Sequence, residues 1–203
     1  MPAALRLETL TGDAILPHLP ALARLRIAVF RDWPYLYDGD EGYERDYLAT
    51  YARAPGAAVV IAFAGAEPVG ASTCLPLVAE TANVLAPFRA RGLDPARFFY
   101  FGESVLLREW RGGGTGVGFF AAREAHARAV PGCAFATFCA VVRAADDPRR
   151  PAGFVPLDGF WRKRGYAPLE GLFCTMSWRE TGQAAASEKR LAFWAKSLAG
   201  AAA

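Results

Sequence analysis

A cluster of glycines is the feature of this sequence whose spacing points most directly to chemistry. Gly112, Gly113, Gly114 and Gly116 lie between an apolar run and a stretch with helical periodicity. Glycine permits positive φ and lets a ligand approach the main chain closely. The first amide N–H groups of a helix lack intrahelical acceptors, and the helix dipole adds partial positive charge there. A plain turn needs only one glycine, so we interpret this segment as a site for phosphate oxygens. A tight turn without a ligand is the alternative.

Two motifs narrow the identity of the phosphate ligand. A P-loop requires a Lys after its glycines, and none follows here, which argues against a nucleoside triphosphate. The spacing Gly116-x-Gly118-x-x-Ala121 fits a dinucleotide fingerprint and leaves a nicotinamide-dependent oxidoreductase open. However, several residues separate this pair from the end of the preceding apolar run. Arg143 also ends the next run, where the fingerprint expects an acidic residue.

The periodicity of apolar residues predicts the strands and helices that would position this turn. Apolar runs predict strands over residues 4–9, 58–64, 69–78, 98–107, 134–142 and 171–178. Helical periodicity predicts helices over residues 16–31, 43–53, 83–91, 116–129, 159–164 and 188–198. This order predicts an α/β (α+β) fold with a mixed, mostly antiparallel central sheet and helices on both faces. We expect one domain over residues 1–180, with residues 181–203 as its C-terminal helical extension.

Composition excludes several classes of protein. The 203 residues fit one domain, and 53% hydrophobic with 21% charged residues is typical of a folded protein. A net charge of +3 with scattered basic residues argues against a nucleic-acid surface. No signal peptide and no apolar run of membrane-spanning length is apparent, so we expect no membrane association and a cytoplasmic location. The four cysteines form no CxxC pair and only two histidines exist, so we expect reduced buried thiols and no metal.

Two motifs together resemble the GNAT (N-acetyltransferase) superfamily. Its acetyl-CoA signature, [Q/R]-x-x-G-x-[G/A] before a helix, is matched at every fixed position by Arg111–Gly116. A second family pattern is a short aromatic helix followed by Gly and an aromatic residue, which the segment Phe160–Tyr166 resembles. The order of elements is similar over about residues 5–178. The resemblance implies a GNAT-like fold and acyl-CoA as donor.

The resemblance also assigns the residues that would hold acetyl-CoA. Main-chain amides of the signature would bind its pyrophosphate, and the preceding strand would pair with its pantetheine arm where the sheet opens as a V. The residues concerned are Val105, Leu106, Leu107, Arg111, Gly112, Gly113, Gly114, Thr115 and Gly116, with Trp161 on the short helix. Arg111 would contact a phosphate or cap local carbonyls. A nearby basic loop, Arg143, Arg149 and Arg150, would meet the 3′-phosphate or remain solvated.

Attack of an amine on a thioester needs a base, an oxyanion donor and an acid for the leaving thiolate. Glu103 is the only carboxylate in the apolar strand FFYFGESVLL, and we take it as candidate base, with Tyr100 and Ser104 as alternates. A glutamate that faces solvent or pairs with an Arg is the alternative. In a regular strand Tyr100 and Ser104 point away from Glu103, unless a β-bulge lies near Gly102. Trp161 replaces the family's usual tyrosine acid.

The acceptor side is expected in the aromatic and acidic segment DWPYLYDGDEGYERDYL. Trp33, Tyr35, Tyr37 and Asp38 would suit a cationic or amphipathic amine. Buried packing at a hinge is the alternative, because aromatic side chains usually belong to a core.

The sequence therefore predicts an N-acetyltransferase that transfers an acetyl group from acetyl-CoA to a primary amine of a small or amino-acid-like acceptor by direct attack. A non-catalytic acyl-CoA sensor on the same fold is the alternative, slightly favoured by Trp161. Phe193 and Trp194 near the C-terminus fit either a homodimer contact or packing back onto the domain.

Overall fold

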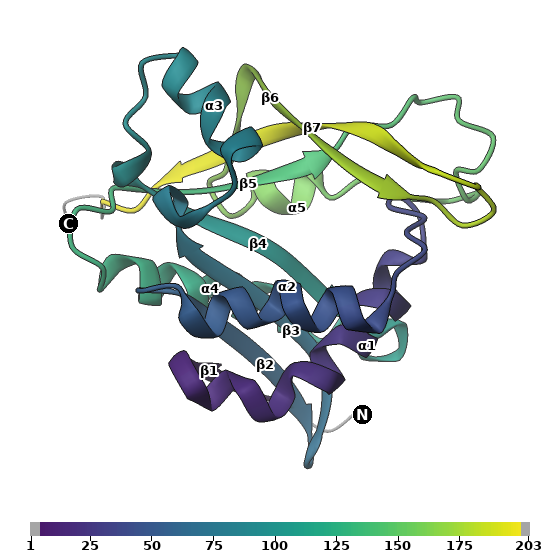
Figure 1. Cartoon of the computed structure of the whole chain (residues 1–203), viewed down its shortest axis with the longest axis horizontal. Coiled ribbons are helices and arrows are strands. Elements are labelled where there is room, and N and C mark those ends of the chain that lie inside the picture. Colours follow the sequence, from purple (N-terminus) through teal and green to yellow (C-terminus); the bar gives the residue numbers. More distant parts are fainter. Residues whose placement is uncertain (1–4, 200–203) are drawn as a thin grey trace.

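The computed structural model describes residues 5–199. A single seven-stranded sheet runs through the molecule in the order β1-β2-β3-β4-β5-β7-β6 (Figure 1). Only β4 and β5 pair in parallel, and all other neighbours are antiparallel. The strands are β1 (Arg6–Leu10), β2 (Ala58–Ala64), β3 (Glu67–Pro76), β4 (Phe98–Leu106), β5 (Phe135–Val141), β6 (Ala167–Arg179) and β7 (Ala186–Ser197). The predicted fold class is confirmed. Ala4, where the first strand was predicted to start, lies outside the described residues.

Helices cover both faces of the sheet. They are α1 (Leu19–Phe30), α2 (Glu41–Arg53), α3 (Ala82–Ala90), α4 (Thr115–Arg128) and α5 (Asp158–Arg162), with short 3-10 segments η1 (Gly12–His18), η2 (Leu77–Ala79), η3 (Pro95–Arg97) and η4 (Arg108–Trp110). In Figure 1, α1 and α2 lie in front of β2, β3 and β4, and α4 lies behind them. The helix predicted from residue 16 begins only at Leu19, because the prolines at 17 and 20 favour the tighter 3-10 turn before it.

Each face of the sheet has its own apolar core. Val59, Ile61 and Val105 pack toward α1, α2 and α3, whereas Phe99 and Phe101 pack toward α4 and α5. Burying each such side chain contributes about 1.5–3 kcal/mol. Because the central strands are buried on both sides, their sequences are continuous apolar runs rather than alternating ones.

The predicted C-terminal helix is wrong: its residues form β7. This strand lies inside the sheet, and pairs with β5 from Phe135↔Ser197 to Val141↔Leu191 and with β6 on its other side. Leu191 and Phe193 enter one core, and Trp194 enters the other. An inner strand with both faces buried gives a short continuous apolar run, which periodicity does not distinguish from a helix. Residues 186–197 of the expected helical extension therefore complete the central sheet, and residues 200–203 lie outside the described residues.

Two irregularities lie in the middle of the sheet. Ser72 pairs with Ser104 and Cys74 with Phe101, so Thr73 faces two residues of β4, Gly102 and Glu103. This is a β-bulge in β4, which reverses the facing of every later side chain. The second irregularity is the short pairing between β4 and β5, which shapes the candidate site.

Candidate functional site

The sheet opens between its two parallel strands. Pairing of β4 with β5 covers only Phe98↔Phe135 to Tyr100↔Thr137, although both strands continue. Figure 1 shows the two strands diverging from there toward the right-hand end of the molecule. The Leu107 N–H donates to Val69 O of β3 at 3.0 Å. Successive residues of a strand point their peptide groups to opposite edges, so the peptide groups of Leu106 face the open edge.

The glycine turn presents its amides to open space. Gly112 and Gly114 have φ of 86° and 87°, and Gly114 precedes the first residue of α4. The first backbone bonds of α4 run from Val117 and Gly118 to Gly114 O. Among the described residues, no backbone hydrogen bond uses the N–H groups of residues 112–116. A Cβ placed on Gly112, Gly113 or Gly114 would meet nothing within 4 Å. The turn therefore has the unpaired, accessible N–H groups that bind phosphate.

The later glycines serve packing instead. A Cβ on Gly116 would lie 3.3 Å from the ring of Phe160, and one on Gly118 would lie 2.5 Å from Leu7. Gly118 thus lets α4 approach β1 closely. Gly116 and Gly118 are the two glycines that fit the dinucleotide fingerprint. The close approach of Leu7 to Gly118 explains the second of them by helix packing, without a ligand.

The arginines considered as phosphate contacts are engaged with groups of the chain itself. Arg111 Nε donates to Leu106 O at 2.9 Å, which is the carbonyl-capping alternative. Arg150 donates to Ala145 O at 3.3 Å, and Arg143 and Arg149 bind Glu180. In this conformation the three arginines of that loop therefore hold carbonyl and carboxylate groups of the chain itself.

The bulge places Tyr100 and Glu103 on the same face of β4. Tyr100 and Val105 belong to the core under α1 and α2, and Glu103 contacts residues of those helices. Tyr100 therefore shares the face of Glu103, as predicted for a β-bulge near Gly102, because the extra residue reverses the alternation of a regular strand. Ser104 lies on the other face, where its Oγ accepts a hydrogen bond from Arg123 Nη2 at 2.8 Å. The structure brings two of the three candidates together and separates the third.

Glu103 is buried and paired. Its side chain is 6% exposed, and Arg26 Nη1 lies 2.6 Å from its Oε1. The Tyr47 hydroxyl donates to Glu103 Oε2 at 3.2 Å and lies 2.9 Å from the Tyr51 hydroxyl. The predicted alternative of pairing with an arginine is therefore the state of Glu103 in this structure.

Tyr100 carries a buried phenol at the point where the strands separate. Its hydroxyl lies 3.1 Å from Cys139 Sγ of β5. Burial, followed by the neighbouring Cys139, raises the pKa of Tyr100 well above its ordinary value. The phenol therefore stays protonated and can serve as a proton donor.

Sequence reasoning missed several polar residues on the face of β4 that carries Tyr100 and Glu103: Arg26, Tyr47, Tyr51, Glu80 and Cys139. One signal was available, because Arg26 follows Leu22 by one turn on the buried face of α1. The others come from three further elements, which the sequence does not place side by side. Burial raises the pKa of Glu80 above its ordinary value, although the Thr81 N–H donates to it at 3.1 Å.

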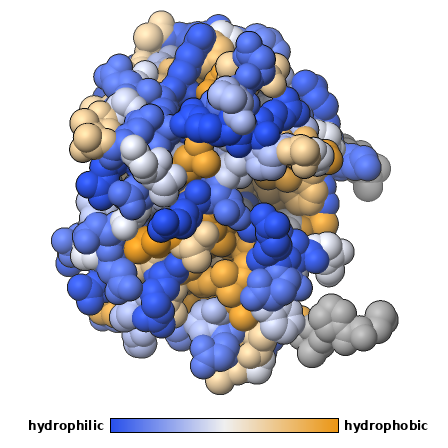
Figure 2. Space-filling model, turned by 90° about the vertical axis from the view of Figure 1, so that its right-hand side faces the viewer, coloured by the Kyte–Doolittle hydropathy of each residue, from blue (hydrophilic) through white to orange (hydrophobic). Residues whose placement is uncertain are grey.

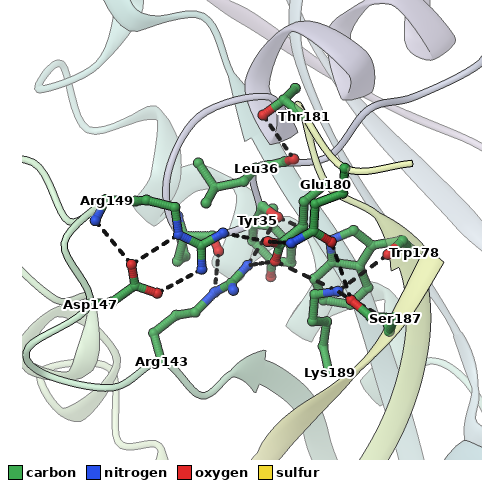
Figure 3. Close-up of polar contacts among 12 residues, drawn as sticks. Tyr35, Leu36, Arg143, Asp147, Arg149, Trp178, Glu180, Thr181, Ser187 and Lys189 are labelled. Atoms are coloured by element: carbon green, nitrogen blue, oxygen red, sulfur yellow. Dashed lines mark hydrogen bonds and ion pairs between the residues drawn. The ribbon is translucent and has the colours of Figure 1, made fainter. Parts of the chain in front are cut away.

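The predicted acceptor loop is held in place by a buried glutamate (Figure 3). Glu180 is 1% exposed, and its oxygens lie 2.6 Å from Arg143 Nη2 and 2.5 Å from Arg149 Nη1. Arg143 also donates to Pro34 O at 2.7 Å and to Tyr35 O at 3.1 Å. Burial by itself raises the pKa of Glu180, but the hydrogen bonds from Arg149 and Arg143 outweigh it and lower that pKa overall. The charged cluster thus fixes the backbone of the loop.

The four predicted acceptor residues have different surroundings. Tyr35 packs between Phe30 and Trp178, with ring centroids 4.5 and 5.9 Å away, and burial raises its pKa. Trp33 lies near the Arg143 guanidinium, Tyr37 forms a β-bridge with Glu180, and Asp38 pairs with Arg179 at 2.7 Å. Tyr35 therefore has the buried packing of the hinge alternative. The backbone of the loop is held by Arg143, which bonds to Glu180.

Trp161 on α5 belongs to an aromatic cluster. Its ring lies 5.0 Å from Phe138 and 5.1 Å from Trp194. Tyr166, the neighbouring phenol, is buried and donates to Glu124 Oε1 at 3.1 Å. Neither residue lies on the face that carries Tyr100 and Glu103.

Figure 2 views the end of the molecule toward which the strands diverge and shows apolar surface bordered by hydrophilic side chains.

Comparison with solved structures shows the GNAT fold. The chain is similar to a ribosomal-protein-alanine N-acetyltransferase from Brucella melitensis (TM-score 0.61, 17% identity, 95% of this chain and 99% of that one). An aminoglycoside 6′-N-acetyltransferase complexed with coenzyme A gives a TM-score of 0.61 at 14% identity, covering 96% and 98%. A GNAT-like decarboxylase, GphF, in complex with isobutyryl-CoA gives 0.58 at 17%, covering 95% and 99%. No protein-family model matches the sequence, and no curated protein matches it. The identities are low, so the comparison establishes the fold.

Two features are absent from residues 5–199. No helix there is long and apolar enough to cross a membrane. No group of three or more His, Cys, Asp or Glu side chains there is arranged to hold a metal ion.

Proposed function

We propose that this protein is an acyl-CoA-dependent N-acetyltransferase that transfers the acetyl group of acetyl-CoA to a primary amine of a small or amino-acid-like acceptor. The observation that carries the proposal is the open glycine turn beside the unpaired edge of β4. Solved structures of this fold with coenzyme A and isobutyryl-CoA bound support a CoA derivative as the donor.

The donor would be recognised through the main chain. The N–H groups of residues 112–116 would bind the pyrophosphate, and the α4 dipole would add to the attraction. The pantetheine arm would run along the open edge of β4, where Leu106 presents its peptide N–H and where Arg111 would release the Leu106 carbonyl. The thioester would then reach the opening between β4 and β5.

Proton transfer would be the task of two residues on the α1 and α2 face. Glu103 would take a proton from the acceptor's ammonium group, and the neutral amine would attack the thioester carbonyl. Collapse of the tetrahedral intermediate would break the carbon–sulfur bond. Tyr100 would give its proton to the leaving thiolate and regain one from the attacking nitrogen, which becomes the amide. Trp161 lacks an acidic proton for this role.

A charge placed in the glycine turn tests the donor site. Gly113 lacks the positive φ of its neighbours, and its Cβ position is open, so Asp and Asn both fit there. We expect Gly113→Asp to weaken acetyl-CoA binding about 100-fold, because its carboxylate repels the pyrophosphate at close range. Gly113→Asn has nearly the same shape and no charge, and should change the affinity much less. Calorimetry measures both, and equal affinities for the two variants would rule out this turn as the donor site.

A non-catalytic acyl-CoA sensor is the second candidate, favoured by Trp161 in place of an acid. An assay of thiol release over a library of amines separates the two functions. Acetyl-CoA binding with thiol release at background for every amine would identify a sensor. Release that depends on one class of amine would identify the enzyme and its acceptor.

A further inference from the structure

A buried charged cluster lies between α1, α2 and β4. Arg26 Nη1 is 2.6 Å from Glu103 Oε1, and Arg26 Nε donates to Glu44 Oε2. The side chains of Glu44, Glu103 and Arg26 are 0%, 6% and 12% exposed. One guanidinium therefore serves two carboxylates that water barely reaches. The three groups carry a net charge of −1 when all are ionised.

The guanidinium is shared unevenly between its partners. Its Nε is hydrogen-bonded to Glu44, whereas the contact of Nη1 with Glu103 Oε1 lacks hydrogen-bond geometry. Burial lowers the pKa of Arg26 as the largest influence, but Glu103, Tyr47 and Glu44 outweigh it and raise that pKa overall. Arg26 therefore stays charged. Its guanidinium lies over the rings of Tyr47 and Phe30, 4.4 and 5.1 Å from their centroids, which limits its movement.

The other groups around Glu103 are neutral or acidic. Tyr47 and Tyr51 of α2 and Tyr100 of β4 have pKa values raised well above normal by burial, and burial likewise raises the pKa of Tyr35. Glu80 lies near enough to interact with Glu103. Arg123 of α4 reaches the main-chain oxygen of Glu103, 3.1 Å away, from the opposite face. Among the described residues, Arg26 is thus the cation that contacts this carboxylate.

The geometry points to Arg26 and Glu44 as positioning residues that together set how readily Glu103 accepts a proton. A buried carboxylate without a cation would hold its proton at neutral pH, and one with a fully committed arginine would be a weak base. Glu44 competes for the same guanidinium, so Glu103 does not hold it alone. The inference rests on the proposed function, because it assigns these roles toward the base of that reaction.

Two substitutions should move the acidic limb of the kcat/KM profile in opposite directions. Arg26→Met removes the cation that favours ionised Glu103, so the limb should move to higher pH by about one unit or more. Glu44→Gln frees Arg26 to bond with Glu103 alone, so the limb should move to lower pH, with a smaller plateau because the base is weaker. A role in stability alone would lower activity in both variants without shifting the limb in opposite directions.

Matched controls come from the same helices. Arg24→Met in α1 and Glu41→Gln in α2 remove the same charges at exposed positions and should leave the limb unchanged. Where Arg26→Met does not fold, Arg26→Lys takes its place. Lysine keeps the charge but cannot reach both carboxylates, so the acidic limb should again move to higher pH. The inference is overturned when active Glu44→Gln protein shows no downward shift, or shifts in the same direction as the Arg26 variant.

A measurement without turnover separates this inference from the proposed function. Isotope-edited infrared titration of the glutamate carboxylates, with Glu103→Gln for assignment, follows the protonation of Glu103 directly. Opposite shifts of its midpoint in the two variants support the coupling even where no amine is acetylated. Absence of turnover in the native protein would contradict the proposed function, whereas unmoved midpoints would contradict the roles of Arg26 and Glu44.

Discussion

The proposed donor side of the site consists of main-chain groups, whereas the proposed acceptor side consists of side chains. The donor side consists of main-chain groups from one continuous stretch, the end of β4 and the turn to Gly116. The acceptor side consists of side chains from α1, α2, β4, β5 and the loop after α1. Main-chain recognition depends on glycine positions and little else. Side-chain recognition depends on the packing of elements far apart in sequence, and each contact there can be removed separately.

Glu103→Gln should separate the two sides most strongly. The amide cannot take a proton from the acceptor, so we expect turnover to fall about 100-fold or more. Acetyl-CoA affinity should stay within about threefold of native, because Glu103 lies outside the donor contacts. Steady-state kinetics and calorimetry on the same preparation measure both. Undiminished turnover across the pH range would remove Glu103 as the base.

Tyr100→Phe tests the acid on the same face. We expect turnover to fall about 10- to 100-fold at neutral pH, since the thiolate then leaves without a proton. Native activity should show no alkaline loss from Tyr100 below pH of about 10, because burial raises the pKa of this phenol. Cys139→Ala removes the neighbour of the hydroxyl and is the control. A loss as large in Cys139→Ala would indicate packing rather than proton transfer.

Glu180→Gln should lower stability and weaken acceptor binding without changing the chemical step. Arg143 and Lys189 would lose their buried anion, so we expect a stability loss of about 3 kcal/mol and a raised KM for the amine. The folded-state pKa of Glu180 is lowered, so its stabilising effect is present above the unfolded value of about 4.3 and is lost as pH falls through the folded value. Native protein should therefore lose more stability than the variant on acidification, as denaturation at several pH values would show. Equal pH dependence in the two proteins would contradict this role.

Ser104→Ala should have the smallest effect. Ser104 lies on the face opposite to Glu103 and accepts from Arg123, so we expect a stability loss of about 1 kcal/mol and turnover within about threefold of native. Thermal denaturation and the same kinetic assay check these values. A 100-fold loss of turnover would return Ser104 to the catalytic candidates and place the reacting groups on the α4 face.

The fold class and the open glycine turn were predictable because both depend on local patterns. Apolar periodicity located β2, β4, β5, α2 and α4 to within a few residues. The open amides followed from the Arg111–Gly116 spacing. The C-terminal strand was mistaken for a helix because Leu191, Phe193 and Trp194 are buried on both faces of one inner strand. An apolar run of that length carries no periodicity that identifies it as a strand.

The amino-acid sequence alone determined the open glycine turn at the start of α4, since glycine conformation and free helix-start amides are properties of a few consecutive residues. Tertiary structure alone decided which side chains surround Glu103. One extra residue in β4 turned that carboxylate toward α1, and helix packing placed Arg26 and Tyr47 against it. Facing in a strand reverses with a single insertion, and contacts between helices and strands arise only when distant segments bury a common core.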